Sequence, residues 1–123
     1  MNFIHYYEKA IEFHDYEKSL DDKFSLHNLH YKNFNLNQND YSRIANLSAT
    51  NILVITEPWC GDSVAILPVV KKISEANPNW NLKLILREKN LDLMEKFLTN
   101  GNKSIPIFLF LNNCNNSPLL YLF

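Results

Sequence analysis

The segment TEPWCGDSVAILP, residues 56–68, places one cysteine where a side chain is best able to do chemistry. Cys60 follows an apolar β-branched run and precedes apolar residues at helical spacing, so we expect it at the start of a helix. The unpaired N–H groups and the positive dipole end of a helix N-terminus stabilise a thiolate, which is the nucleophilic form of cysteine. The spacing therefore makes Cys60 a candidate nucleophile.

The residues next to this cysteine are expected to have opposite effects on its reactivity: some favour the thiolate or access to the sulfur, and others disfavour the thiolate. Trp59 offers a flat apolar surface beside the sulfur, and Gly61 leaves out a side chain that would crowd it. Ser63, on the first helical turn, is placed to donate a hydrogen bond to the thiolate. Asp62 and Glu57 bring negative charge, which disfavours a thiolate. The alternative to a reactive thiol is a small buried cysteine at the start of a helix.

The four histidines are the other candidates for chemistry, and all of them precede residue 51. His27 and His30 are three residues apart, but no Cys-x-x-Cys or His-Glu-x-x-His spacing accompanies them. Nothing identifies one histidine as a base for Cys60. We therefore expect no metal site and no cofactor.

The charge and hydropathy of the chain limit the classes of partner that it can be expected to bind. The 123 residues carry 12 basic and 13 acidic side chains, whereas phosphate binding needs a clear basic excess. No apolar run approaches the roughly 20 residues of a membrane-spanning helix. Acidic residues interrupt the first 20 positions, which does not fit a signal peptide. We expect a cytoplasmic protein with no nucleic-acid or membrane partner, in which both cysteines are free thiols.

Hydrophobic periodicity predicts the elements that position Cys60. Residues 2–18 have the spacing of an amphipathic helix, and a short helix capped at Asn39 or Asp40 is expected before residue 50. The apolar run at residues 51–56 is typical of a strand covered on both faces. The later predicted elements are a helix ending near Asn77, a strand at 81–88, a helix at 91–98 and hairpin strands at 105–112 and 118–123.

The segment EPWCGDSVAILPVVKKISEANP, residues 57–78, resembles the active-site strand end and helix of the thioredoxin superfamily. Pro68 follows Cys60 by eight residues, as the family's helix-kinking proline does, and SIP at 104–106 resembles the family's cis-proline loop. The chain is most similar to bacterial single-cysteine members that read WCGD. The resemblance implies an α/β thioredoxin-like fold, a central mixed sheet with helices on its faces, with residues 51–123 as the core and 1–50 as a helical N-terminal extension packed on it.

The resemblance also implies a function, monothiol thiol–disulfide exchange. Cys60 would attack a disulfide-containing protein or a small-thiol substrate, with Ser63 stabilising the thiolate. An external thiol such as glutathione would release the product. The residues expected to hold the substrate are Trp59, Gly61, Asp62, Ile105 and Pro106.

Two positions depart from the dithiol members of the superfamily. Ser63 stands where they have a second cysteine, so a mixed disulfide has no local thiol to resolve it. Val54 stands where many thioredoxins have a buried acid. Cys114 is not expected to replace the missing thiol, because about 25 Å of extended chain would separate it from Cys60, beyond the reach of a disulfide. The alternative function is a non-catalytic thioredoxin-like protein-binding module.

The family's final helix is also missing from the sequence. The last predicted strand, PLLYLF, carries no charge, so an apolar face and edge of the sheet would stay uncovered. Three explanations stay open. The N-terminal helices fill the gap, or a homodimer forms through the uncovered face or the C-terminal edge strand, or the chain is shortened relative to its relatives.

Overall fold

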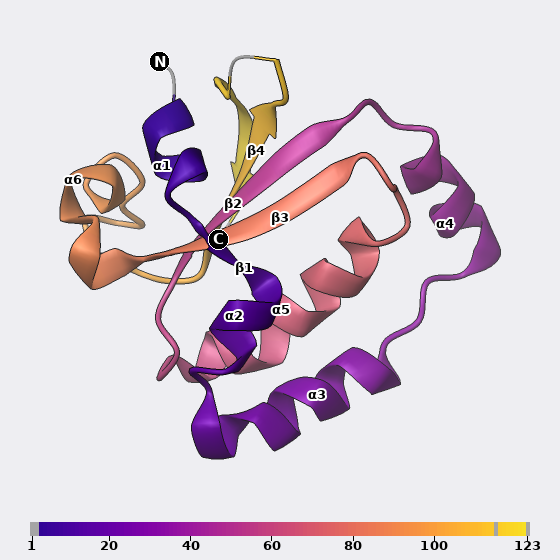
Figure 1. Cartoon of the computed structure of the whole chain (residues 1–123), viewed down its shortest axis with the longest axis horizontal. Helices are drawn as coiled ribbons and strands as arrows, with labels where there is room; N and C mark the ends of the chain where they lie inside the picture. Colours follow the sequence, from indigo (N-terminus) through magenta and orange to yellow (C-terminus); the bar gives the residue numbers. More distant parts are fainter. Residues whose placement is uncertain (1–2, 115, 123) are drawn as a thin grey trace.

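The computed structural model describes residues 3–114 and 116–122, and its centre is a five-stranded sheet (Figure 1). The strands are β1 (Ile11–Glu12), β2 (Thr50–Thr56), β3 (Trp80–Leu86), β4 (Ile107–Asn112) and β5 (Pro118–Leu122). Across the sheet their order is β1-β3-β2-β4-β5. β2 runs parallel to β3, and the other neighbouring pairs are antiparallel. The mixed sheet of the predicted α/β fold is confirmed.

β2 lies in the middle of the sheet and is buried along its whole length. Its β-branched sequence predicts a strand that is covered on both faces. Val54, for example, is paired with Leu84 of β3 on one side and with Phe108 of β4 on the other. Because neighbouring strands and two layers of side chains hold β2, the position of its last residue, Thr56, is fixed.

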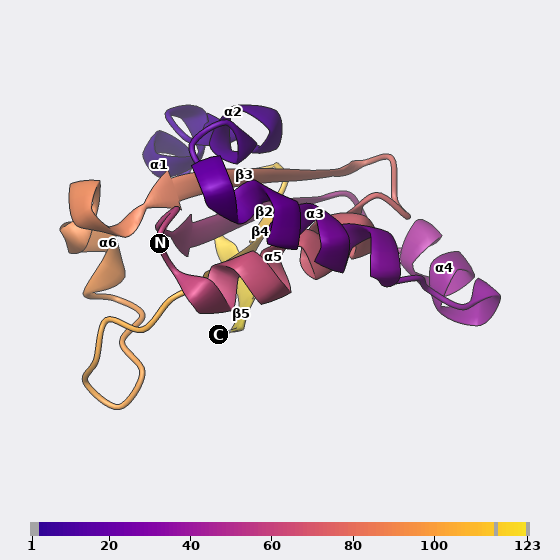
Figure 2. The same ribbon diagram turned by 90° about the horizontal axis from the view of Figure 1, so that it is seen from below.

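Helices cover both faces of the sheet. Among the described residues they are α1 (Ile4–Glu8), α2 (Phe13–Glu17), α3 (Phe24–Asn33), α4 (Gln38–Ala45), α5 (Gly61–Ser74) and α6 (Leu91–Met94), with 3₁₀ turns η1 (Asp21–Lys23) and η2 (Arg87–Lys89). α3 packs beside α5, and α4 and α6 lie at opposite ends of the molecule (Figures 1 and 2). In the part of the chain that the structure describes, no helix is both long enough and apolar enough to cross a membrane.

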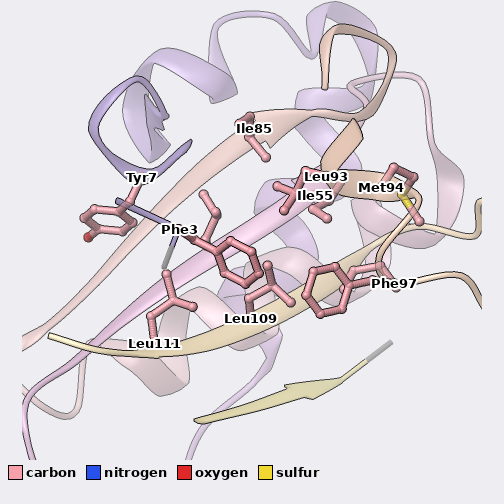
Figure 3. Packing of buried hydrophobic residues seen from close by; sticks show 11 residues of the cluster. Phe3, Tyr7, Ile55, Ile85, Leu93, Met94, Phe97, Leu109 and Leu111 are labelled. Atoms are coloured by element: carbon pink, nitrogen blue, oxygen red, sulfur yellow. The ribbon is translucent and has the colours of Figure 1, made fainter. Parts of the chain in front are cut away.

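One face of the sheet is covered by the start of the chain and by the segment around α6 (Figure 3). The ring of Phe3 meets that of Phe97 edge to face, with 5.7 Å between ring centroids. The hydroxyl of Tyr6 donates a hydrogen bond to Asp92, which ties α1 to α6. The buried cluster on this face comprises Phe3, Tyr7, Leu53, Ile55, Ile85, Leu93, Met94, Phe97, Ile107, Leu109 and Leu111.

The opposite face is covered by α2 and α5. The buried cluster there comprises Phe13, Tyr16, Leu20, Ile52, Val54, Leu67, Leu82, Leu84 and Phe108. Residues from the start of the chain therefore contribute to the core on both sides of the sheet. Within the described residues no helix follows β5.

The single helix predicted for residues 2–18 is wrong. α1 ends at Glu8, and the chain then becomes extended so that Ile11 pairs with Leu84 at the edge of β3. α2 begins directly afterwards, at Phe13. The break has a physical reason. The extended segment covers the backbone edge of β3, and it lets the apolar residues before and after it reach opposite faces of the sheet. One straight helix cannot do both.

Two other helix boundaries also differ from the predictions. The N-cap of α4 is Asn37, whose side-chain oxygen accepts the N–H of Asp40 at 2.9 Å, and not Asn39 or Asp40 itself. The helix predicted at residues 91–98 ends at Met94. The N–H of Glu95 still bonds to the carbonyl four residues back, whereas those of Lys96 and Phe97 bond to carbonyls three residues back. The apolar spacing persists through this tighter turn, which is why the sequence pattern overestimated the helix.

Phe3 provides a test of whether the N-terminal residues belong to the cooperative core. Its side chain is 1% exposed. Replacement by alanine should lower the free energy of unfolding by about 3 kcal/mol, because it removes a buried ring and leaves a cavity. Leu29→Ala, at a residue of α3 that is 51% exposed, should cost less than about 1 kcal/mol. Urea denaturation measures both, and equal small losses would show that Phe3 lies outside the core.

Candidate functional site

The junction between β2 and α5 places Cys60 at a helix N-terminus, where the sequence predicts it. Cys60 is the N-cap of α5 and has an extended backbone conformation. Its carbonyl oxygen accepts the N–H of Val64 at 3.1 Å, and its own N–H donates to the carbonyl of Glu57 at 3.1 Å. The second bond closes a tight turn after the buried strand. The thiol is therefore carried between a fixed strand end and the unpaired N–H groups of the first helical turn.

The sulfur of Cys60 lies against the loop that precedes β4. The thiol donates a hydrogen bond to the carbonyl oxygen of Ile105, with 3.8 Å between Sγ and O. The Ile105–Pro106 peptide bond is cis, as the SIP motif predicts. Cys60 is only 8% exposed, so the sulfur is reached from one side. The carbonyl favours the protonated thiol, whereas the helix N–H groups favour the thiolate.

Ser63 lies one helical turn after the cysteine, and its side chain points into the protein. Its hydroxyl is 2.5 Å from that of Thr56, and either oxygen can be the donor. Each hydroxyl has one hydrogen. The hydrogen of Ser63 is free for another acceptor only when Thr56 is the donor. The predicted role of Ser63 thus depends on the direction of its hydrogen bond with Thr56.

The two carboxylates that were expected to oppose the thiolate are turned away or solvated. The side chain of Glu57 is buried, and its Oε2 accepts the backbone N–H of Glu88 at 2.9 Å. This bond ties the turn after β2 to η2, which follows β3. Asp62 is exposed on the first turn of α5, where solvent and salt screen its charge. Neither feature could be predicted from the positions of the acids in the sequence.

Arg87 is a site residue that the sequence analysis missed. Its guanidinium lies over the ring of Trp59, 5.1 Å from the ring centroid, and its Nη1 donates to the carbonyl of Lys103 at 2.9 Å. Nε and Nη2 bind the carboxylate of Glu88 at 2.8 and 2.6 Å. Arg87 therefore links the segment before Cys60 to the loop before Pro106. Its place directly after β3 was the available signal, because the carboxyl ends of adjacent parallel strands meet at one edge of a sheet.

An apolar groove of about 460 Å³ lies between α5 and the start of β4, together with the loop that precedes β4. Its lining includes Asp62, Ile66, Val70, Ile105, Pro106 and Phe108. Ile66, on α5, is exposed. Three residues predicted to hold substrate, Asp62, Ile105 and Pro106, therefore share one surface.

The remaining predicted contacts lie at the start of α5. Trp59 is 55% exposed. A Cβ atom added at Gly61 would meet nothing within 4 Å, so packing in this chain does not require the glycine. The open space beside Gly61 is consistent with its predicted role of leaving the approach to the sulfur uncrowded.

The other candidates for chemistry are distant from this site or already paired. Cys114 is exposed in the turn between β4 and β5, at the opposite end of β4 from Pro106, and both cysteines are free. His27 is buried between the rings of Phe13 and Phe24, and its Nε2 is 3.1 Å from the carboxylate of Glu17. Across the described residues, no three His, Cys, Asp or Glu side chains are grouped so that they could hold a metal ion.

The sheet order, the cysteine at the start of α5 and the cis-proline loop beside it define a thioredoxin-like protein. A family model described as thioredoxin matches residues 10–119, and the chain belongs to this family.

Two solved structures share the fold. One is a protein of unknown function, PA1234, from Pseudomonas aeruginosa, with 16% sequence identity and a TM-score of 0.85, and the other is an HIV epitope-scaffold, with 17% identity and a TM-score of 0.85. Each alignment covers 99% of this chain and 76% of the other chain. No curated protein matches the chain.

The contact between Arg87 and Trp59 can be tested by fluorescence in a Trp80→Phe background, in which Trp59 is the only tryptophan. Arg87→Gln should lower the anisotropy of Trp59 and increase its quenching by acrylamide. The reason is that the lost stacking contributes about 0.5–1 kcal/mol and holds the ring in place. Arg43→Gln, in α4, is the matched control and should change neither quantity. Unchanged Trp59 fluorescence in the Arg87 variant would contradict the contact.

Proposed function

We propose that this protein carries out monothiol thiol–disulfide exchange through Cys60 and that an external thiol resolves the mixed disulfide. The observation that carries the proposal is the position of Cys60 at the N-cap of α5, with its sulfur 3.8 Å from the carbonyl oxygen of Ile105. Trp59 precedes the same cysteine, and Ile105, which the sulfur contacts, also lines the apolar groove. Because Ser63 replaces a second cysteine, the chemistry ends at a mixed disulfide unless another thiol enters.

The proposed reaction has two balanced steps. In the first, the Cys60 thiolate attacks one sulfur of a substrate disulfide. The S–S bond breaks, a new S–S bond joins Cys60 to that half of the substrate, and the other half leaves as a thiolate and takes a proton from water. In the second, the thiolate of reduced glutathione attacks the substrate-derived sulfur of the mixed disulfide. This step restores the Cys60 thiolate and leaves the first half of the substrate as a disulfide with glutathione.

Each group at the site has a part in these steps. The carbonyl of Ile105 holds the hydrogen of the resting thiol. Once this proton is lost, the carbonyl repels the thiolate, which favours movement of the sulfur toward the helix N–H groups and Ser63. Trp59 and the apolar groove would take up the side chains next to the substrate cysteine. Of the possible substrates, a disulfide-containing protein and a small mixed disulfide both fit this arrangement.

The exchange reaction can be measured with a glutathionylated model peptide and reduced glutathione. Cys114→Ser should retain the full catalysed rate, because Cys114 lies in a distant turn. Cys60→Ser should fall to the uncatalysed rate, because serine cannot form the mixed disulfide. A wild-type protein that is no faster than the uncatalysed reaction, although folded, would contradict the proposal.

A second function, a non-catalytic protein-binding module, is favoured by two observations. Val54 is fully buried and apolar under the thiol site, so β2 supplies no proton acceptor there. The groove beside Pro106 is also wide enough to hold apolar side chains without any chemistry. The Cys60→Ser variant separates the two functions, because a binding module keeps its partner after this change and loses it when the exposed Ile66 becomes glutamate.

A further inference from the structure

A buried tyrosine from the N-terminal residues reaches the turn that carries the thiol. Tyr16, in α2, is 2% exposed, and its hydroxyl lies 3.4 Å from the backbone carbonyl oxygen of Glu57. The same carbonyl accepts the N–H of Cys60 at 3.1 Å. The tyrosine and the cysteine therefore share one acceptor, although 44 positions separate them in the sequence.

The hydroxyl of Tyr16 also adjoins a pair of buried hydroxyls. It interacts with the side chain of Thr56, whose oxygen is 2.5 Å from that of Ser63. All three residues are buried, so water does not compete for their hydrogen bonds. The arrangement connects α2, the end of β2 and the first turn of α5 through polar atoms inside an otherwise apolar cluster.

Tyr16 acts as a hydrogen-bond donor in this network. Burial, the largest cause, raises the pKa of Tyr16 to about 12, with the charges of Cys60 and Glu57 acting in the same direction and the Thr56 hydrogen bond acting against them. The phenol therefore keeps its proton at any pH at which a thiol reacts. Its hydrogen is directed to the carbonyl oxygen of Glu57, whereas the Thr56 hydrogen bond that lowers the pKa of Tyr16 is one in which Thr56 donates to the phenol oxygen.

We propose that Tyr16 is a positioning residue for the thiol. By donating to the carbonyl of Glu57, it fixes the turn between Glu57 and Cys60 and so holds the thiol at the first N–H groups of α5. This inference rests on the exchange function proposed above. It gives the N-terminal residues a part in the chemistry as well as in the core. It also means that a polar side chain from outside β2 helps to fix the position of the thiol, because β2, TNILVIT, contains no ionisable side chain.

Tyr7 is a closely matched control for this proposal. It also lies in the first 20 residues and is buried, and its hydroxyl also donates to a backbone carbonyl, that of Asn81 at 3.2 Å. Burial likewise raises the pKa of Tyr7 to about 12, with a smaller effect of the charge of Glu12. Tyr7 packs in the cluster on the opposite face of the sheet from Tyr16. Removing its hydroxyl therefore deletes the same kind of bond without touching the thiol site.

The test is the pH profile of Cys60 alkylation by iodoacetamide in the full-length Cys114→Ser protein. We expect Tyr16→Phe to slow alkylation several-fold near neutral pH and to move the midpoint of the profile to higher pH, because the loosened turn no longer holds the thiolate at the N–H groups of the first helical turn. Tyr7→Phe should give the same profile as the parent. Circular dichroism and urea denaturation confirm that each variant is folded.

The outcomes separate this inference from the exchange function. A Tyr16→Phe profile that matches the parent's, or one that shifts no more than that of Tyr7→Phe, overturns the positioning role and leaves exchange through Cys60 intact. A parent whose Cys60 alkylates with a midpoint at or above that of free cysteine, about 8.5, contradicts the exchange function and this inference together.

Discussion

The hydrogen bond between the N–H of Cys60 and the carbonyl of Glu57 is the constraint on which the rest of the site depends. It closes the turn at the end of β2, a strand that neighbours and side chains hold on every side. Because this strand cannot shift without disturbing the whole core, the turn and the first N–H groups of α5 are fixed relative to the sheet. The loop after β3 and the loop before β4 then meet the turn through Glu88 and Ile105. The thiol is therefore placed by the sheet and does not depend on a flexible loop.

The site has the geometry of a thioredoxin-like protein without the groups of a dithiol mechanism. The residue one turn after the cysteine is a serine, and the strand beneath supplies only apolar side chains and threonine hydroxyls near the sulfur. Neutral hydroxyls of Thr56, Ser63 and Tyr16 occupy this region. Such groups can stabilise a thiolate by donating hydrogen bonds, but they do not take up a proton at neutral pH. The arrangement therefore fits one thiol and a substrate or reductant that supplies the second.

Local sequence signals predicted the parts of the fold that are decided locally. The apolar run of β2, the helical spacing after Cys60 and the SIP segment each describe their own environment, and the structure confirms β2, α5 and the cis-proline loop. The two-residue strand β1 was not predictable, because its pairing with β3 depends on an exposed edge about 70 residues later in the chain. Arg87 and Tyr16 were missed for the same reason. Only the packing of α2 shows that the hydroxyl of Tyr16 reaches Glu57.

The central claim is that Cys60 forms a mixed disulfide that only an outside thiol can resolve, and intact-mass analysis of the Cys114→Ser protein tests it most directly. The folded protein is incubated with oxidised glutathione and then with an excess of reduced glutathione. We predict that one glutathione per chain becomes attached at Cys60, stays attached after the oxidised glutathione is removed, and is released when reduced glutathione is added. A folded protein that acquires no glutathione, or one that loses it without an added thiol, would contradict this account.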